Sequence, residues 1–176
     1  MDLSAEASIA QPRDAVFRVY RDELVNLLPY LPNVRRIEVK SREEKGDRVA
    51  LVNVWHGGGE IPAAVRKFLS DSMLSWTDYA EWDEAEHACT WRSESHSFKD
   101  AVHSQGRNVF LEDGPGRSII RIGGRIDVDA ARIKGVPSLL AGGIGPVIER
   151  FLVKQVQDNL QEVARGVDRY LRENPR

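Results

Sequence analysis

Residues 145–174 read GPVIERFLVKQVQDNLQEVARGVDRYLREN, and this stretch decides the fold. Its apolar residues recur at steps of three, four and one, which places them on one face of an α-helix. Glu149, Lys154 and Asp158 fall largely on the opposite face. The spacing therefore predicts one long amphipathic helix whose apolar stripe must be buried against another element. The stripe consists of Ile148, Phe151, Leu152, Val156, Leu160, Val163, Val167, Tyr170 and Leu171.

The residues before this helix alternate between apolar and polar, which is the period of a half-buried strand. Tight turns separate the alternating runs, at Lys45–Asp47, Asp83–Glu86 and Asp113–Gly116 among others. Parallel strands would need crossovers of about a dozen residues, so short turns predict an antiparallel sheet. About seven strands are expected, at residues 2–9, 34–45, 48–56, 75–83, 88–97, 102–112 and 117–128.

Helical segments interrupt the strands at two places and a glycine-rich stretch precedes the final helix. Pro12 can begin a helix without losing a hydrogen bond, and helical spacing follows over residues 13–28, where we expect two short helices. A further short helix is expected near residues 62–69. Residues 142–146, which include three glycines and Pro146, predict a hinge that leads into the last helix.

Length and composition indicate one soluble domain over residues 1–176 with a substantial core. The chain is 41% hydrophobic and 30% charged, and its net charge of -2 gives no reason to expect nucleic acid binding. No apolar run approaches the ~20 residues of a membrane span, and residues 1–6 lack the features of a signal peptide. A single cysteine, Cys89, excludes an internal disulfide. We therefore expect a cytoplasmic protein, and its oligomeric state stays open.

The element order resembles the START-like or Bet v 1-like superfamily, also called SRPBCC or helix-grip proteins. Residues 9–17, IAQPRDAVF, look like the family's opening strand and proline-started helix, and residues 28–34, LPYLPNV, look like its link to the second strand. Residues 159–164, NLQEVA, resemble the closing helix of polyketide-cyclase-like members. The resemblance implies an α+β helix-grip fold, in which a curved antiparallel sheet surrounds the C-terminal helix. It also implies a cavity between sheet and helix that holds a lipid, isoprenoid or polyketide-like ligand.

Aromatic and polar residues of the strands are the candidate ligand contacts. Trp55, Trp76 and Trp91 would fill the core or line the cavity, since pocket walls are largely aromatic and aliphatic. Residues 92–97, RSESHS, are unusually polar for the middle of a sheet. If either face of this strand points inward, its polar groups need partners, because bare burial costs about 1–3 kcal/mol per neutral group. We expect polar contacts from Arg92, Glu94, His96 and His103, and apolar contacts from Phe68 and Phe151.

A carrier without catalytic residues, cofactor or metal is the leading hypothesis. The spacing of the four histidines, His56, His87, His96 and His103, matches no familiar metal-binding pattern. The alternative is an enzyme of the cyclase, dehydratase or hydrolase type that acts on a polyketide-like or aromatic substrate. A histidine base beside Glu94 or Arg92 would suffice for it. The two hypotheses differ in whether His96 and His103 meet a carboxylate inside the cavity.

The segment 57–74 joins three glycines to a short basic amphipathic stretch. Ile61, Val65 and Phe68 supply an apolar face, and Arg66 and Lys67 flank it. Such a segment suits a mobile lid over the cavity or a transient contact with a membrane surface. It also suits a helix packed across the open end of the sheet with its basic residues in solvent.

Overall fold

The computed structural model describes residues 1–58, 60–61, 63, 66–67, 69–133 and 138–175. Within these residues the chain forms a seven-stranded antiparallel sheet, four short helices and one long C-terminal helix. The strands are β1 (Asp2–Ile9), β2 (Val34–Lys45), β3 (Arg48–Gly57), β4 (Ser75–Asp83), β5 (Ala88–Ser95), β6 (Val102–Glu112) and β7 (Ser118–Val128). The helices are α1 (Arg13–Asp22), η1 (Leu24–Tyr30), η2 (Asp71–Met73), η3 (Ala130–Arg132) and α2 (Ser138–Glu173).

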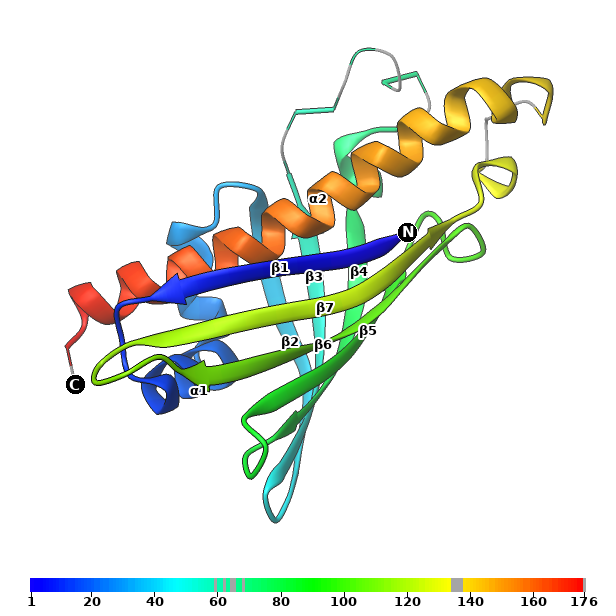
Figure 1. Ribbon diagram of the computed structural model, residues 1–176. Coiled ribbons are helices and arrows are strands. Elements are labelled where there is room, and N and C mark those ends of the chain that lie inside the picture. The colour runs from blue at the N-terminus through cyan, green and yellow to red at the C-terminus, as the bar shows by residue number, and fades with distance from the viewer. Residues whose placement is uncertain (59, 62, 64–65, 68, 134–137, 176) are drawn as a thin grey trace.

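The sheet has the strand order β1-β7-β6-β5-β4-β3-β2, so consecutive strands from β2 to β7 are neighbours. Short connections join these neighbours, as the sequence predicted, except that residues 58–74 connect β3 to β4. Register shifts interrupt the pairing of β2 with β3 between Val34 and Arg36 and between Val39 and Ser41. Such irregularities bend a strand and increase its twist. The sheet curves strongly, and α2 lies in its concave side beside β1 and β7 (Figure 1). This is the helix-grip fold that the resemblance implied.

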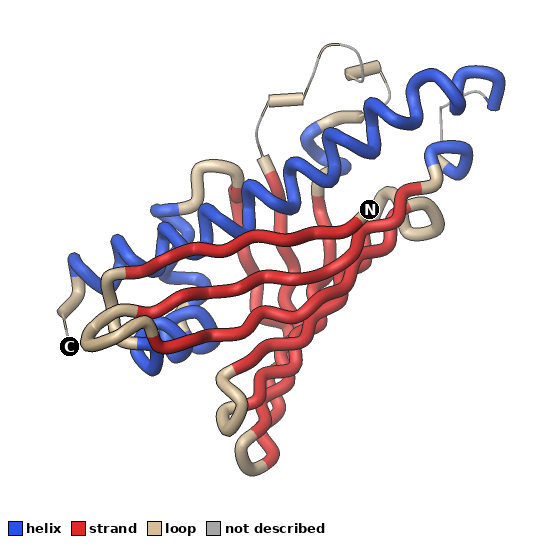
Figure 2. The backbone as a smooth tube through the Cα atoms, viewed as in Figure 1, coloured by secondary structure: helices blue, strands red, loops and turns tan. Residues whose placement is uncertain are grey.

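The long helix α2 buries most of its apolar stripe, whereas Val156, Leu160 and Tyr170 are half-buried. Ile148 and Val167 are completely buried, and Val163 is 3% exposed. The prediction was wrong about where the helix begins, because α2 starts at Ser138 and includes the glycines and Pro146 that were expected to form a hinge. Arg150 Nε donates a hydrogen bond to the Pro146 carbonyl oxygen at 3.0 Å within that turn. Figure 2 shows α2 as one continuous helix along the sheet.

The two short helices after β1 close one end of the space between α2 and the sheet, as Figure 1 shows. Amphipathic spacing in α1 turns Val16, Phe17 and Tyr20 toward the sheet, where they are buried. The Phe17 ring lies edge-on to Trp82 and Phe110, with centroids 5.3 and 5.2 Å apart. Aromatic pairs in this geometry add about 0.5–1.5 kcal/mol to the burial of their surface. This end of the molecule is therefore solidly packed.

The buried residues form two clusters rather than one. The first lies around α1, η1 and the C-terminal half of α2 and includes Phe17, Trp82 and Val167. The second lies toward the N-terminal half of α2 and includes Trp91 and Ile148. The space between the two clusters is where the candidate site lies.

Four of the eight residues 62–69, where a short helix is expected, lie outside the described residues, and residues 63, 66 and 67 form turns. In the described part of this segment, Leu69 is buried, whereas Arg66 and Lys67 are exposed. Arg66 donates a hydrogen bond to the Ile61 carbonyl oxygen at 3.0 Å. The proposed lid and membrane contact remain predictions. Across the described part of the chain, no helix combines the length and apolar character that crossing a bilayer requires.

Candidate ligand-binding cavity

A cavity of about 170 Å³ lies between the concave face of the sheet and α2. Its wall is mostly apolar and is formed by side chains that the period-two alternation of the strands turns inward. The strand residues in the described lining include Leu51, Asn53 and Trp55 of β3; Trp76, Asp78, Ala80 and Trp82 of β4; Cys89, Trp91, Ser93 and Ser95 of β5; Ser104 and Asn108 of β6; and Ile126 of β7. Tyr20 and Leu24 line the closed end, and α2 contributes Leu152, Gln155, Val156, Asn159, Leu160 and Val163.

The tryptophans chosen from the sequence lie on this wall. Trp55 and Trp76 are direct partners in the register of β3 and β4. Their indole rings stack with centroids 5.8 Å apart and an angle of 8° between the planes. Trp91 lies on the next strand but one from Trp55 and is also part of the wall. Whether these rings contact a ligand remains a prediction, but all three are placed to do so.

The Trp91 ring occupies a space that two glycines leave open. Gly106 and Gly124 follow Trp91 in register across β6 and β7. A Cβ atom on Gly106 would lie 2.5 Å from Trp91 Cζ2, and one on Gly124 would lie 3.2 Å from the same atom. Trp91 Nε1 donates a hydrogen bond to Asn108 Oδ1 at 3.0 Å, and Asn108 is 2% exposed. The indole is therefore held against the backbone of the sheet in one orientation.

A row of polar side chains crosses the middle of the apolar wall. Asn53, Asp78, Ser93 and Ser104 are successive partners in the registers of β3, β4, β5 and β6, and all four line the cavity. Neighbouring strands are about 4.8 Å apart, so the row extends over roughly 14 Å. From α2, the uncharged side chains of Gln155 and Asn159 line the same cavity. The cavity thus offers hydrogen-bonding groups to a ligand that is otherwise surrounded by apolar surface.

Asp78 is the central group of this row. Removal from water raises the pKa of its carboxyl to about 7, and a hydrogen bond from the Asn53 side chain opposes that rise. Asn53 is 2% exposed, so it is fixed in place beside Asp78. Burial also raises the pKa values of the Tyr20 phenol and the Cys89 thiol, and the nearby Asp78 charge adds to both shifts. Near neutral pH, Asp78 is thus balanced between its protonated and ionised forms.

Three of the polar residues chosen from the sequence lie on the other face of the sheet. The inward residues of β5 are Trp91, Ser93 and Ser95, so alternation turns Arg92 and Glu94 outward. The Arg92 guanidinium lies over the Tyr79 ring, 3.8 Å from its centroid, and pairs with Glu94. His103 faces Glu94 in the register of β5 and β6 and is exposed. The expectation that these side chains orient a ligand in the cavity is corrected accordingly.

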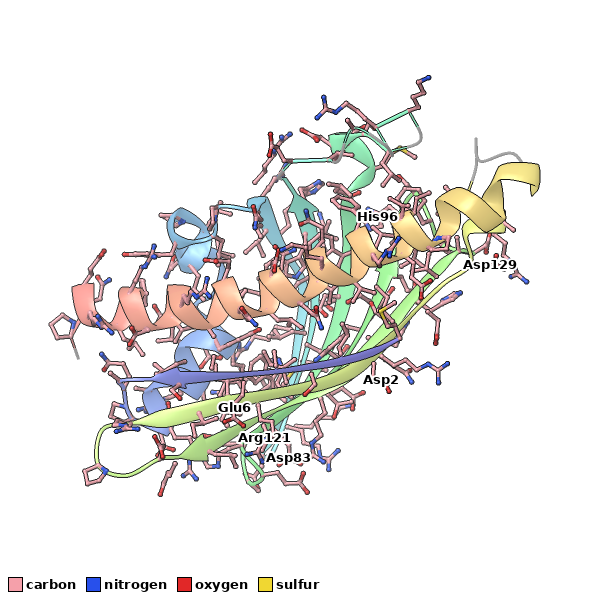
Figure 3. All side chains as sticks on the ribbon, turned by 45° about the horizontal axis from the view of Figure 1, so that its top comes forward. Asp2, Glu6, Asp83, His96, Arg121 and Asp129 are labelled. Carbon is pink, nitrogen blue, oxygen red and sulfur yellow. The ribbon has the colours of Figure 1, made fainter. Side chains whose placement is uncertain are left out.

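His96 lies just beyond the end of β5 (Figure 3) and is also absent from the described lining. Its Nδ1 lies 3.1 Å from Ser75 Oγ and its Nε2 lies 2.8 Å from Thr77 Oγ1, so the ring is bound to the end of β4. His56 Nε2 lies 3.2 Å from Glu38 Oε1, and His87 Nε2 lies 3.1 Å from Asp14 Oδ1. No histidine is among the lining residues that the structure describes, which removes the base expected for the enzyme alternative.

The two phenylalanines chosen from the sequence do not supply described cavity contacts. Phe151 is 8% exposed and is absent from the described lining. Its ring packs in the second core cluster, which also includes Ile148 and Leu152. Phe68 lies outside the described residues. Phe98 lines the cavity, although continued alternation along β5 would turn it outward like Arg92. This is possible because β5 ends at Ser95 and the chain turns before Phe98.

Asp78 is the candidate site residue that the sequence analysis does not name. It shares its parity with Trp76, Ala80 and Trp82, so period-two alternation places a carboxylate on the apolar face of β4. A single acid among large apolar residues of one face is a recognisable signal. The run of polar residues on β5 is the stronger signal in the sequence, although only part of it lines the cavity.

Comparison with known proteins supports the fold. No family model matches the chain, and no curated protein matches it. Among solved structures, TTHA0849 from Thermus thermophilus is similar at 19% identity, with a TM-score of 0.70 and full coverage of both chains. The Zhui aromatase/cyclase from Streptomyces sp. R1128 is 19% identical, with a TM-score of 0.65 over 99% of this chain and 98% of that one. Norcoclaurine synthase from Thalictrum flavum, in complex with dopamine and hydroxybenzaldehyde, is 15% identical, with a TM-score of 0.60 over 100% of this chain and 88% of that one.

Proposed function

The chain has the Bet v 1-like helix-grip fold, and from this premise we propose that it binds a hydrophobic small molecule between the sheet and α2. The observation that carries the proposal is the cavity itself, which is walled by indole and aliphatic side chains and crossed by one polar row. Burial of apolar ligand surface supplies about 25 cal/mol per Å². The polar row would fix the orientation of the bound molecule. Two of the similar structures are an aromatase/cyclase and a synthase with aromatic ligands, which agrees with a ring compound as ligand.

The size of the cavity narrows the ligand class. An apolar cavity of about 150 Å³ in another protein holds benzene. The present volume of about 170 Å³ therefore suits a molecule of one or two rings without rearrangement of the wall. A lipid with two acyl chains would need several times this space. We accordingly favour a compact aromatic ligand of one or two rings over the lipid or isoprenoid that the sequence also allowed.

Two matched substitutions test the proposal. Ala80 is 5% exposed and lines the cavity, whereas Ala50 is exposed on the outer face of β3. We expect Ala80→Leu to weaken the binding of naphthol, a neutral two-ring probe, at least tenfold in a titration of tryptophan fluorescence. Ala50→Leu should leave the affinity unchanged. Native mass spectrometry of the protein purified without detergent would identify a resident ligand. Equal affinities for the two variants, or no binding by the unmodified protein, would reject the proposal.

One observation favours a second candidate, an enzyme that transfers protons. Among the described lining residues, Asp78 has a pKa near neutrality, which suits a general acid or base. Its carboxylate could take a proton from the carbon next to a ligand carbonyl and return it. Incubation with tetralone, a two-ring ketone, in heavy water tests this: exchange of that proton for deuterium, lost in Asp78→Asn, supports the enzyme. An exchange rate equal to that in buffer alone would reject it.

A further inference from the structure

The cavity contains one acidic side chain and no basic one among its described lining residues. Asp78 is the acid, and no Lys, Arg or His is part of that lining. The remaining titratable groups near Asp78 are the Tyr20 phenol and the Cys89 thiol. Both are neutral at physiological pH because burial raises their pKa values. The ionised form of Asp78 therefore has no counter-charge among the described groups of the cavity.

The described side chains that pair with Asp78 in register or share its cavity wall are uncharged. Asn53 is its partner from β3 and Ser93 its partner from β5. Gln155 and Asn159 line the cavity from α2, and Tyr20 does so from α1. Glu81, on the same strand, is exposed on the opposite face of the sheet. The hydrogen bond from Asn53 compensates the carboxylate only in part, so a bound ligand that donates to Asp78 would stabilise its ionised form and an anionic ligand would destabilise it.

We propose that the cavity selects its ligand by charge: it binds a neutral, mostly apolar molecule that donates a hydrogen bond to Asp78, and it rejects carboxylate, phosphate and sulfate ligands. This inference rests on the proposed function, because it concerns the same cavity. A hydroxyl donor on the ligand would hydrogen-bond to the carboxylate and so replace part of the hydration that Asp78 loses on burial. An anion would place a second negative charge a few ångströms away in a medium that screens it poorly.

The titration of Asp78 gives the selection a pH dependence. Above its pKa of about 7 the carboxylate repels an anionic ligand. Below that value the protonated carboxyl carries no charge and can itself donate a hydrogen bond to an anion. Anion affinity should therefore fall as the pH rises through the titration of Asp78. The affinity of a neutral hydroxyl compound should not fall in this way.

Three probes of nearly equal shape test the inference: naphthol, methoxynaphthalene, which lacks the donor, and naphthoate, which is an anion. Calorimetric titrations at about pH 5.5 and about pH 8 bracket the ionisation of Asp78. At the higher pH the unmodified protein should bind naphthol at least tenfold more tightly than either of the others. Naphthoate affinity should rise at least tenfold at the lower pH.

Two variants separate the roles of charge and shape. Asp78→Asn should make naphthoate affinity independent of pH over this range, while Glu81→Gln, the same change on the outer face of β4, should behave as the unmodified protein does. Circular dichroism establishes that both variants are folded. Equal binding of all three probes, unchanged in Asp78→Asn, would overturn charge selection and leave the proposed function standing. No binding of any probe by the unmodified protein would overturn the proposed function and this inference together.

Discussion

Asn53 and Asp78 face each other across β3 and β4, and the Asn53 side chain donates a hydrogen bond to the Asp78 carboxyl. The pair lies on a wall that is otherwise dominated by indole and aliphatic groups. One hydrogen bond does not replace the hydration that a carboxylate loses on burial. The folded protein therefore retains a group whose ionisation opposes folding, which is an arrangement more common at functional sites than in cores.

The first prediction concerns stability against pH. Burial raises the pKa of Asp78 from 3.8 to about 7, so between these values the folded state binds more protons than the unfolded state. The contribution of Asp78 to the free energy of unfolding must then fall as pH rises from about 4 to about 7. Each pKa unit corresponds to about 1.4 kcal/mol, so the full loss is on the order of 4 kcal/mol.

Asp78→Asn removes this titration and should be more stable than the unmodified protein at about pH 8, with a smaller difference at about pH 5. Urea unfolding of both proteins at the two pH values measures the difference. Glu81→Gln is the control, and its difference from the unmodified protein should not vary in this way. Parallel pH profiles for Asp78→Asn and the unmodified protein would show that Asp78 ionises freely.

The second prediction concerns the outer face of β5. Arg92 lies over the Tyr79 ring and pairs with Glu94, and its side chain is 53% exposed. Exposed cation–π contacts and ion pairs are worth about 1 kcal/mol or less. Arg92→Ala should therefore reduce stability by no more than about 1 kcal/mol and leave naphthol affinity unchanged. A large loss of affinity in this variant would place Arg92 in the binding site after all.

Arg92 and Asp78 show how far the sequence could lead. Both faces of β5 carry polar residues, Ser93 and Ser95 on one and Arg92 and Glu94 on the other, so alternation could not say which face points inward. The answer depends on the register with β4, where Ser93 pairs with Asp78, and register is a tertiary property. The strongly periodic elements were predictable because burial of one face enforces their pattern.

The beginning of α2 and the position of Trp91 could not be predicted for related reasons. Glycine and proline usually end helices, yet Gly142, Gly143 and Pro146 lie inside α2, so local propensity alone misplaces the first residue of the helix. The space that Gly106 leaves for Trp91 depends on two residues from different strands meeting in register. Pairings of this kind become visible only once the sheet is assembled.

The third prediction tests that pairing. A Cβ atom at Gly106 would meet both the Gly123 carbonyl oxygen and Trp91 Cζ2, whereas a Cβ atom at Gly123 would have its nearest neighbour, the Arg107 carbonyl oxygen, at 3.9 Å. Gly106→Ala should destabilise the protein by about 1–3 kcal/mol, the usual cost of overpacking, and should alter the fluorescence of the displaced indole. Gly123→Ala, the same change on the neighbouring strand, should do neither. Equal effects of the two variants in thermal unfolding would contradict the packing described for Trp91.

The last prediction uses the single cysteine as a reporter of access to the cavity. Cys89 is 3% exposed and lines the cavity, and burial raises the pKa of its thiol well above the ordinary value. The thiolate is the reactive form, so modification in the folded protein should be at least a hundredfold slower than in the denatured chain.

Two thiol reagents then test the charge of the cavity: methyl methanethiosulfonate, which is small and neutral, and its anionic sulfonatoethyl analogue. The ratio of the neutral to the anionic reaction rate should be larger for Cys89 in the folded protein than for a free thiol. Asp78→Asn should lower that ratio, because the negative charge that Asp78 places in the cavity is gone. Saturating naphthol should slow both reagents in the unmodified protein; a rate that is indifferent to naphthol would place the ligand away from Cys89.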